Sequence, residues 1–129
     1  MVKLELLFLL MLCHWLADFT HLSTPWMLKA KQIGKPIFPI FIHASVHGTL
    51  MCIVLLFFVP VKTVFILTAF QICTHFSIDV LKGRLNGWFP SLANSTNPYH
   101  WWVFGLDQMM HQAVIILMVA GTNYFSTAL

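Results

Sequence analysis

Histidine and aspartate side chains recur in pairs along this chain, and these pairs are the residues whose types and spacing could do chemistry. Each of four apolar segments carries one pair, and every pair has the spacing i, i+4. On a helix this spacing places two side chains on one face, about 6 Å apart along the axis, which is how helices present two ligands to a metal ion. The pairs are His14 with Asp18, His43 with His47, His75 with Asp79, and Asp107 with His111.

The four pairs are predicted to meet at one depth. A single ionisable residue in an apolar helix is often a satisfied contact between helices, but eight polar groups that converge in hydrocarbon need a common counter-charge. Counting about 1.5 Å per residue from the segment ends predicts similar depths and two tiers. The predicted deeper tier is His14, His47, His75 and His111, and the shallower tier is Asp18, His43, Asp79 and Asp107.

We predict that these eight residues are ligands of two divalent metal ions, because eight nitrogen and oxygen donors exceed what one tetrahedral ion accepts. Imidazole with carboxylate suits zinc, iron or manganese, and the pairs contain no thiolate that would favour copper(I) or an iron–sulfur cluster. Carboxylates beside metal ions can also act as bases. Asp18, Asp79 and Asp107 are therefore the predicted catalytic residues.

The elements that would position these pairs are predicted to be membrane helices. The 129 residues are 59% hydrophobic and 9% charged, with a mean hydropathy of +0.82, which excludes a soluble domain of ordinary surface polarity. We predict an all-α integral membrane bundle of four transmembrane helices that forms one domain over residues 1–129. The predicted spans are about 4–19, 37–59, 61–81 and 101–121.

Two connections carry further signals. Thr24 and Pro25 are typical of a helix start, and together with Trp26 and two lysines they predict a short interfacial helix between the first and second spans. The segment from Gly83 to Tyr99 is rich in Gly, Asn, Ser and Pro and is predicted to be a loop before the last span.

The basic residues predict an orientation rather than a nucleic-acid surface, and we expect no nucleic acid partner. Five of them fall on one side of the bundle and only Lys3 and Lys62 on the other, so the positive-inside rule puts the richer side in the cytoplasm and both termini outside it. Lys29, Lys82 and Arg84 could meet an anionic headgroup or phosphate. The richer side carries Lys29, Lys31, Lys35, Lys82 and Arg84.

Other polar residues are weaker candidates. Gln108 should point about 100° away from its neighbour Asp107 on a helix of 3.6 residues per turn. His100 and Trp26 are expected in an aromatic belt at the membrane interface. Second-layer donors to the metal ligands could be His21, Gln71 and Gln112.

The motifs resemble those of a bacterial family of small polytopic membrane proteins, the domain-of-unknown-function 3307 family. The matching segments extend from Cys13 to Gln112. The resemblance implies a four-span fold and the same set of polar residues, and it implies location in the bacterial inner membrane without naming a reaction. The matching residues are His14 to Phe19, Trp26 with Lys29, His43 to Gly48, His75 to Asp79 with Lys82, and Asp107 and Gln108 with His111.

We predict a membrane-embedded metal-dependent hydrolase that acts on a lipid or a phosphorylated amphipathic substrate near the cytoplasmic face. Three alternatives stay open: a di-iron oxidoreductase of the hydroxylase or desaturase type, a metal transporter or sensor, and a structural subunit of a membrane complex. Apart from Glu5 near the start of the first segment, the outer halves of the four segments contain no ionisable residue, which disfavours transport. A bundle this small is expected to form a homo-oligomer or to join a larger membrane complex.

Overall fold

The computed structural model describes residues 2–127, with side chains from residue 3 to residue 124. This part of the chain contains five α-helices, one short 3-10 helix and no strand, so the prediction of an all-α protein is confirmed. The elements in order are α1 (Val2–Phe19), α2 (Pro25–Ile33), α3 (Ile37–Leu55), α4 (Val61–Trp88), η1 (Pro90–Ala93) and α5 (Pro98–Thr127).

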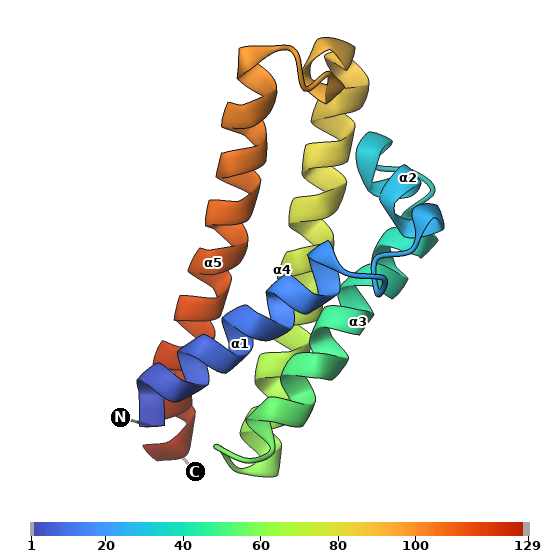
Figure 1. Ribbon diagram of the computed structural model, residues 1–129. Helices are drawn as coiled ribbons and strands as arrows, with labels where there is room; N and C mark the ends of the chain where they lie inside the picture. Colours follow the sequence, from blue (N-terminus) through green and yellow to red (C-terminus); the bar gives the residue numbers. More distant parts are fainter. Residues whose placement is uncertain (1, 128–129) are drawn as a thin grey trace.

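Three long helices form the body of the molecule. α3, α4 and α5 stand beside one another, α1 crosses in front of them at a slant, and α2 lies beside the upper parts of α3 and α4 (Figure 1). The start of α1 and the end of α5 lie at the lower end of the bundle, together with the turn between α3 and α4 (Figure 1). The upper end is formed by α2, η1 and the adjoining ends of α4 and α5.

Three described helices, α3, α4 and α5, are long and apolar enough to cross a membrane, so the prediction of four transmembrane helices was wrong. α1 is 18 residues long and carries Lys3, Glu5 and Asp18, and charges of this number in so short a helix are costly in hydrocarbon. α1 instead packs across α3 and α5. Its contribution to the bundle is the polar pair near its C-terminal end.

The lower half of the bundle has an apolar core. Leu10 of α1, Met51 and Leu55 of α3, and Ile115 and Met118 of α5 are all fully buried. Side chains of this kind hold the helices together through dispersion contacts and close packing. The polar pairs lie above this core.

The short helix α2 confirms the helix predicted between the first and second apolar segments. The Thr24 hydroxyl accepts a hydrogen bond from the Met27 amide (3.4 Å), and Pro25 occupies the first turn. Gly34 ends the helix in the left-handed conformation, at φ 69°. Met27 and Ala30 are buried beneath the helix.

α4 is longer than predicted, because it runs through Gly83 and Gly87 to Trp88. The glycine at position 83 marks a close approach and not a loop. A Cβ on Gly83 would lie 2.2 Å from the Gly34 nitrogen and 2.4 Å from the Lys31 carbonyl oxygen. The missing side chain therefore lets the end of α2 rest directly on α4.

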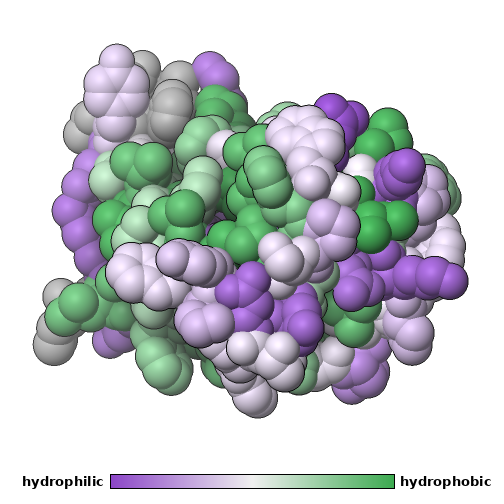
Figure 2. All heavy atoms as spheres, turned by 90° about the horizontal axis from the view of Figure 1, so that it is seen from above, coloured by the Kyte–Doolittle hydropathy of each residue, from purple (hydrophilic) through white to green (hydrophobic). Residues whose placement is uncertain are grey.

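Seen from above, the upper end of the molecule mixes hydrophilic side chains with apolar and weakly polar ones (Figure 2). All five basic residues predicted for one side of the bundle belong to α2, to the turn after it, or to the upper part of α4. Lys3 and Lys62 lie in the first turns of α1 and α4, at the other end of the bundle. The five basic residues therefore lie at one end of the bundle and the other two at the opposite end, as the sequence predicts.

Candidate metal centre

Six of the eight predicted ligands form two groups that could hold metal ions. The first group has four members and the second has three, and His75 belongs to both, which gives six residues in total. Within each group one ligand atom per residue lies within 4.8 Å of all the others. The groups are Asp18, His43, His47 and His75, and His75, Asp79 and His111.

The histidine rings of the predicted deeper tier pack against one another. The ring centroids of His47 and His75 are 3.8 Å apart, and those of His75 and His111 are 4.2 Å apart. His14 completes the cluster, with its ring centroid 5.0 Å from that of His47. Each of the helices α1, α3, α4 and α5 contributes one histidine ring to this layer.

The residue beside His47 explains how α3 and α4 come close enough. A Cβ on Gly48 would lie 2.4 Å from Cγ1 of Ile72, well inside van der Waals contact. Any other residue here would force the Ile72 side chain of α4 to move. The short separation of His47 and His75 depends on this crossing.

His43 is fully buried. Its Nε2 lies 2.8 Å from the Lys31 ammonium, which can only donate, and 2.9 Å from Oδ1 of Asp18, which can only accept when it is ionised. Its Nδ1 lies 3.2 Å from the Ser23 hydroxyl oxygen. Nε2 therefore faces the cluster, and Nδ1 faces Ser23.

His111 shows the same arrangement. Its Nδ1 donates to the backbone carbonyl oxygen of Asp107 at 2.8 Å. Because a carbonyl oxygen can only accept, the neutral ring carries a lone pair on Nε2. That atom lies 3.8 Å from Oδ1 of Asp79, so two acceptors face each other across the site.

Asp79 is the most deeply placed carboxylate, with a fractional exposure of 0%. Within the described residues neither of its oxygens accepts a hydrogen bond, although Nε2 of His75 is 3.3 Å from one of them. The Nε2 atoms of His75 and His111 are also without hydrogen-bond partners in this part of the chain. Buried polar atoms without hydrogen-bond partners are costly, and a metal ion ligated by these atoms would satisfy them.

Lys31, which the sequence analysis placed among the basic residues of one side and not among the site residues, lies within the cluster. It reaches from α2 into the site, where its ammonium lies 2.9 Å from Asp18 and 3.3 Å from Asp79. Burial favours a lower pKa for Lys31, but the carboxylates of Asp79 and Asp18 outweigh burial and hold the pKa above its usual value. Lys31 follows the buried Met27 by four residues, and this spacing was the available signal.

Two predicted ligands, His14 and Asp107, lie beside the two groups and outside them. Nε2 of His14 lies 3.3 Å from Oε1 of Gln108 and 3.4 Å from an oxygen of Asp18. Asp107 accepts from the Lys82 ammonium (2.9 Å) and from the Gln108 amide (3.1 Å). The expectation that Gln108 points away was wrong, because its long side chain bends back between His14 and Asp107.

Of the expected second-layer donors, Gln71 contacts the cluster. It is buried, and its amide nitrogen lies 3.5 Å from Nδ1 of His75. Gln112 lies along α5 one residue beyond His111, and His21 is exposed.

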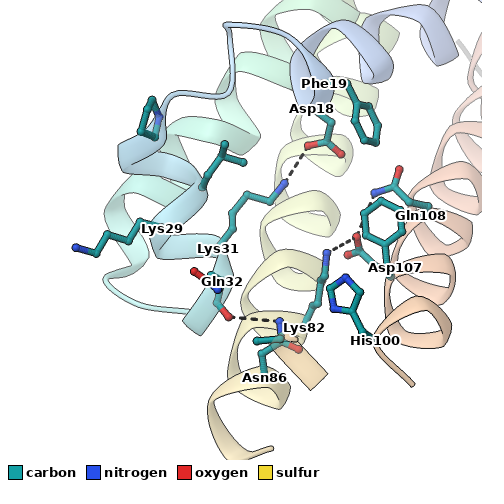
Figure 3. A pocket seen from close by; sticks show the side chains of 14 residues that line it. Asp18, Phe19, Lys29, Lys31, Gln32, Lys82, Asn86, His100, Asp107 and Gln108 are labelled. Carbon is teal, nitrogen blue, oxygen red and sulfur yellow. Dashed lines mark hydrogen bonds and ion pairs between the residues drawn. The ribbon is translucent and has the colours of Figure 1, made fainter. Parts of the chain in front are cut away.

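An open cavity of about 660 Å³ leads to the cluster from the upper end. Asp18, Lys31, Lys82 and Asp107 point into it, whereas Lys29 extends away from it (Figure 3). The cavity lies between α1, α2, η1 and the upper parts of α4 and α5.

The other residues predicted at the membrane interface or at the substrate lie in different surroundings. His100 lines the cavity, where its Nδ1 donates to the Leu92 carbonyl oxygen at 2.7 Å, so its assignment to the belt alone was incomplete. Trp26 is half exposed and packs edge-on against Phe38. Arg84, a predicted substrate residue, is exposed and does not line this cavity.

Comparison with known proteins identifies a family. The chain matches none of the curated proteins and none of the solved structures. The family model described as "Protein of unknown function (DUF3307)" matches residues 6–129, which include all four His and Asp pairs. The chain therefore belongs to the DUF3307 family, as the resemblance of its motifs predicted.

Proposed function

We propose that this protein is a membrane-embedded metal-dependent hydrolase with two divalent ions, and that it acts on a lipid or another phosphorylated amphipathic substrate. One observation carries the proposal: two groups of buried histidines and aspartates share His75 and adjoin a cavity lined by lysines. Pairs of divalent ions are typical of enzymes that cleave phosphoryl or acyl bonds, and the imidazole of His75, which has one lone pair when it is neutral, would ligate one of the two ions.

The charges of the site support bound cations. Three carboxylates lie within it, those of Asp18, Asp79 and Asp107, and two ammonium groups face them, those of Lys31 and Lys82. With neutral imidazoles the site is short of one positive charge. A buried site of this kind favours a further cation.

Access from one end supports an enzyme rather than a transporter. The cavity opens at the upper end, and the apolar core fills the lower half with Leu10, Met51, Leu55, Ile115 and Met118. A permeation path needs polar groups toward both faces, whereas these core side chains offer none.

In the proposed reaction, water attacks the phosphorus or acyl carbon and the ester bond breaks. Divalent ions in the site would acidify the water and polarise the oxygen of the substrate. Asp107 takes the proton of the attacking water, since its carboxylate lies on the cavity wall. Lys82, 2.9 Å from Asp107, stabilises the negative charge that develops on the substrate. Asp107 then gives this proton to the leaving alkoxide, so that the alcohol departs neutral and the carboxylate is restored.

Elemental analysis of the purified protein tests this function, with a hydrolysis assay on phospholipids and phosphoesters. We expect two zinc, manganese or iron ions per chain, a loss of metal and hydrolysis in His47→Ala and Asp79→Ala, and retention of both in His21→Ala. Absence of metal from protein purified without chelator would overturn the metal site. Stoichiometric iron with an oxygen-dependent absorption band would instead favour the di-iron oxidoreductase.

The proposed location is the cytoplasmic membrane of a bacterium, with the lysine-rich upper end inward. The asymmetry of the basic residues supports this orientation.

A further inference from the structure

A second hollow, a groove of about 350 Å³, lies between α1 and α5 on the outer side of the metal centre. α1 contributes most of its wall, and Gln112 of α5 contributes to the other side. Phe8, Trp15 and Phe19 are each more than half exposed along it. The side chains that α1 supplies are Phe8, Met11, Leu12, His14, Trp15 and Phe19.

The groove and the lysine-lined cavity adjoin, because Phe19 and Gln108 line both of them. Gln108 contacts Asp107 on the cavity side (3.1 Å) and His14 on the groove side (3.3 Å). The junction of the two hollows therefore lies next to the candidate metal centre.

The two hollows differ in chemistry. The cavity offers the ammonium groups of Lys31 and Lys82, which lie beside Asp18 and Asp107, whereas Lys29 extends away from it. No charged residue lines the groove, whose walls are mainly apolar. Each volume lies within the range of about 300–1,000 Å³ that is usual for small-molecule sites. A single amphipathic molecule, with a charged headgroup and an apolar chain, would match the cavity and the groove together.

We infer that the groove between α1 and α5 binds an acyl chain of an anionic membrane lipid whose headgroup lies in the lysine-lined cavity. The ester linkage between headgroup and chain then lies at Gln108, beside Asp107 and His14. This inference rests on the proposed function in making the lipid the substrate, but binding of the lipid can be measured separately.

The test measures lipid retention. The full chain is reconstituted in vesicles of equal parts phosphatidylglycerol and phosphatidylcholine, extracted in mild detergent, and analysed for retained lipid by native mass spectrometry. Leu12→Trp fills the groove, and Ile66→Trp is the matched control, because Leu12 and Ile66 are 38% and 37% exposed but only Leu12 lines the groove. Met11→Trp replaces Leu12→Trp if that variant does not fold.

We expect the wild type and Ile66→Trp to retain phosphatidylglycerol over phosphatidylcholine, and the groove variant to retain at least about tenfold less phosphatidylglycerol, a difference of about 1.4 kcal/mol. Lys82→Met should reduce the preference about fivefold, as expected for one basic residue near an anionic headgroup, and Lys62→Met at the other end should not. Equal retention in the Leu12→Trp and Ile66→Trp variants, or no preference for phosphatidylglycerol in the wild type, would overturn the inference.

The two proposals fail differently. Specific retention without hydrolysis at any metal content would overturn the hydrolase and leave the lipid site standing. Metal-dependent hydrolysis that is unchanged in the groove variant would overturn the lipid site and leave the hydrolase standing.

Discussion

At the scale of single residues, the Lys31 ammonium lies where a metal ion would be expected. It contacts Asp18, Asp79 and Nε2 of His43, so it neutralises the same atoms that would bind a cation. The two positive charges would repel at this distance. Lys31 and a metal ion therefore compete for the carboxylates.

Replacing Lys31 by methionine should raise the affinity of the site for zinc at least about tenfold, or about 1.4 kcal/mol. The measurement is a zinc titration against a competing chromophoric chelator. Lys29→Met is the matched control, since Lys29 lies on the same helix and extends away from the site (Figure 3). Unchanged or weaker zinc binding in Lys31→Met would contradict the competition.

The hydroxyl of Ser23 orients His43. Ser23 is buried, and its hydroxyl oxygen lies 3.2 Å from Nδ1, a contact that keeps Nε2 directed into the site. Partners of this kind contribute about 10–100-fold to metal affinity. Ser23→Ala should weaken zinc binding within this range in the same titration, while Ser45→Ala, whose exposed hydroxyl donates to the Phe41 carbonyl oxygen, should bind as the wild type. Equal affinities in the two variants would show that Ser23 does not orient the ring.

At the scale of elements, glycines set the helix approaches on which the site depends. Gly83 lets α2 rest on α4 and so brings Lys31 to the carboxylates, and Gly48 lets α4 approach α3 and so brings His75 to His47. Neither glycine is near a turn. Their role is steric, and it is visible only when the neighbouring helix is present.

Gly83→Ala should destabilise the protein by about 1–3 kcal/mol, the usual cost of forcing atoms into a packed contact, and should release α2. Thermal unfolding measures the first effect, and faster amide exchange in residues 25–33 measures the second. Gly105→Ala is the control, because a Cβ there meets nothing within 4 Å and alanine favours a helix. If α2 exchanges at the same rate in both variants, the contact at Gly83 is not what holds it.

At the scale of the whole molecule, the bundle is divided into an apolar lower half and an upper half that holds the buried His and Asp side chains. Fully buried side chains such as Leu10 and Ile115 hold the lower half without polar contacts. In the upper half, buried acceptors such as both oxygens of Asp79 have no hydrogen-bond donor among the described residues. Metal binding should therefore stabilise the fold through its upper half.

Removing metal with a chelator should lower the melting temperature of the wild type, and restoring zinc should raise it. At a free metal concentration of roughly 100 times Kd the gain is about 2.7 kcal/mol. His111→Ala should show a much smaller response, whereas His21→Ala should respond as the wild type. A melting temperature that does not depend on metal in the wild type would contradict a bound ion.

The sequence by itself determined the helical class, the short helix α2 and the family, because helix periodicity, cap residues and family motifs are local along the chain. It also placed the polar pairs on single helix faces, since the spacing i, i+4 fixes this without any tertiary contact. The number of membrane-crossing helices was misjudged, although Lys3, Glu5 and Asp18 gave a readable warning.

Only the tertiary structure decided which side chains meet. It put His75 into both candidate metal groups, left His14 and Asp107 at their edge, and brought in Lys31 from a helix that the pairs do not include. The physical reason is that convergence depends on how helices cross and how closely they approach. Those approaches are set by contacts between residues far apart in sequence, such as Gly48 with Ile72 and Gly83 with Gly34, and a helical period carries no information about them.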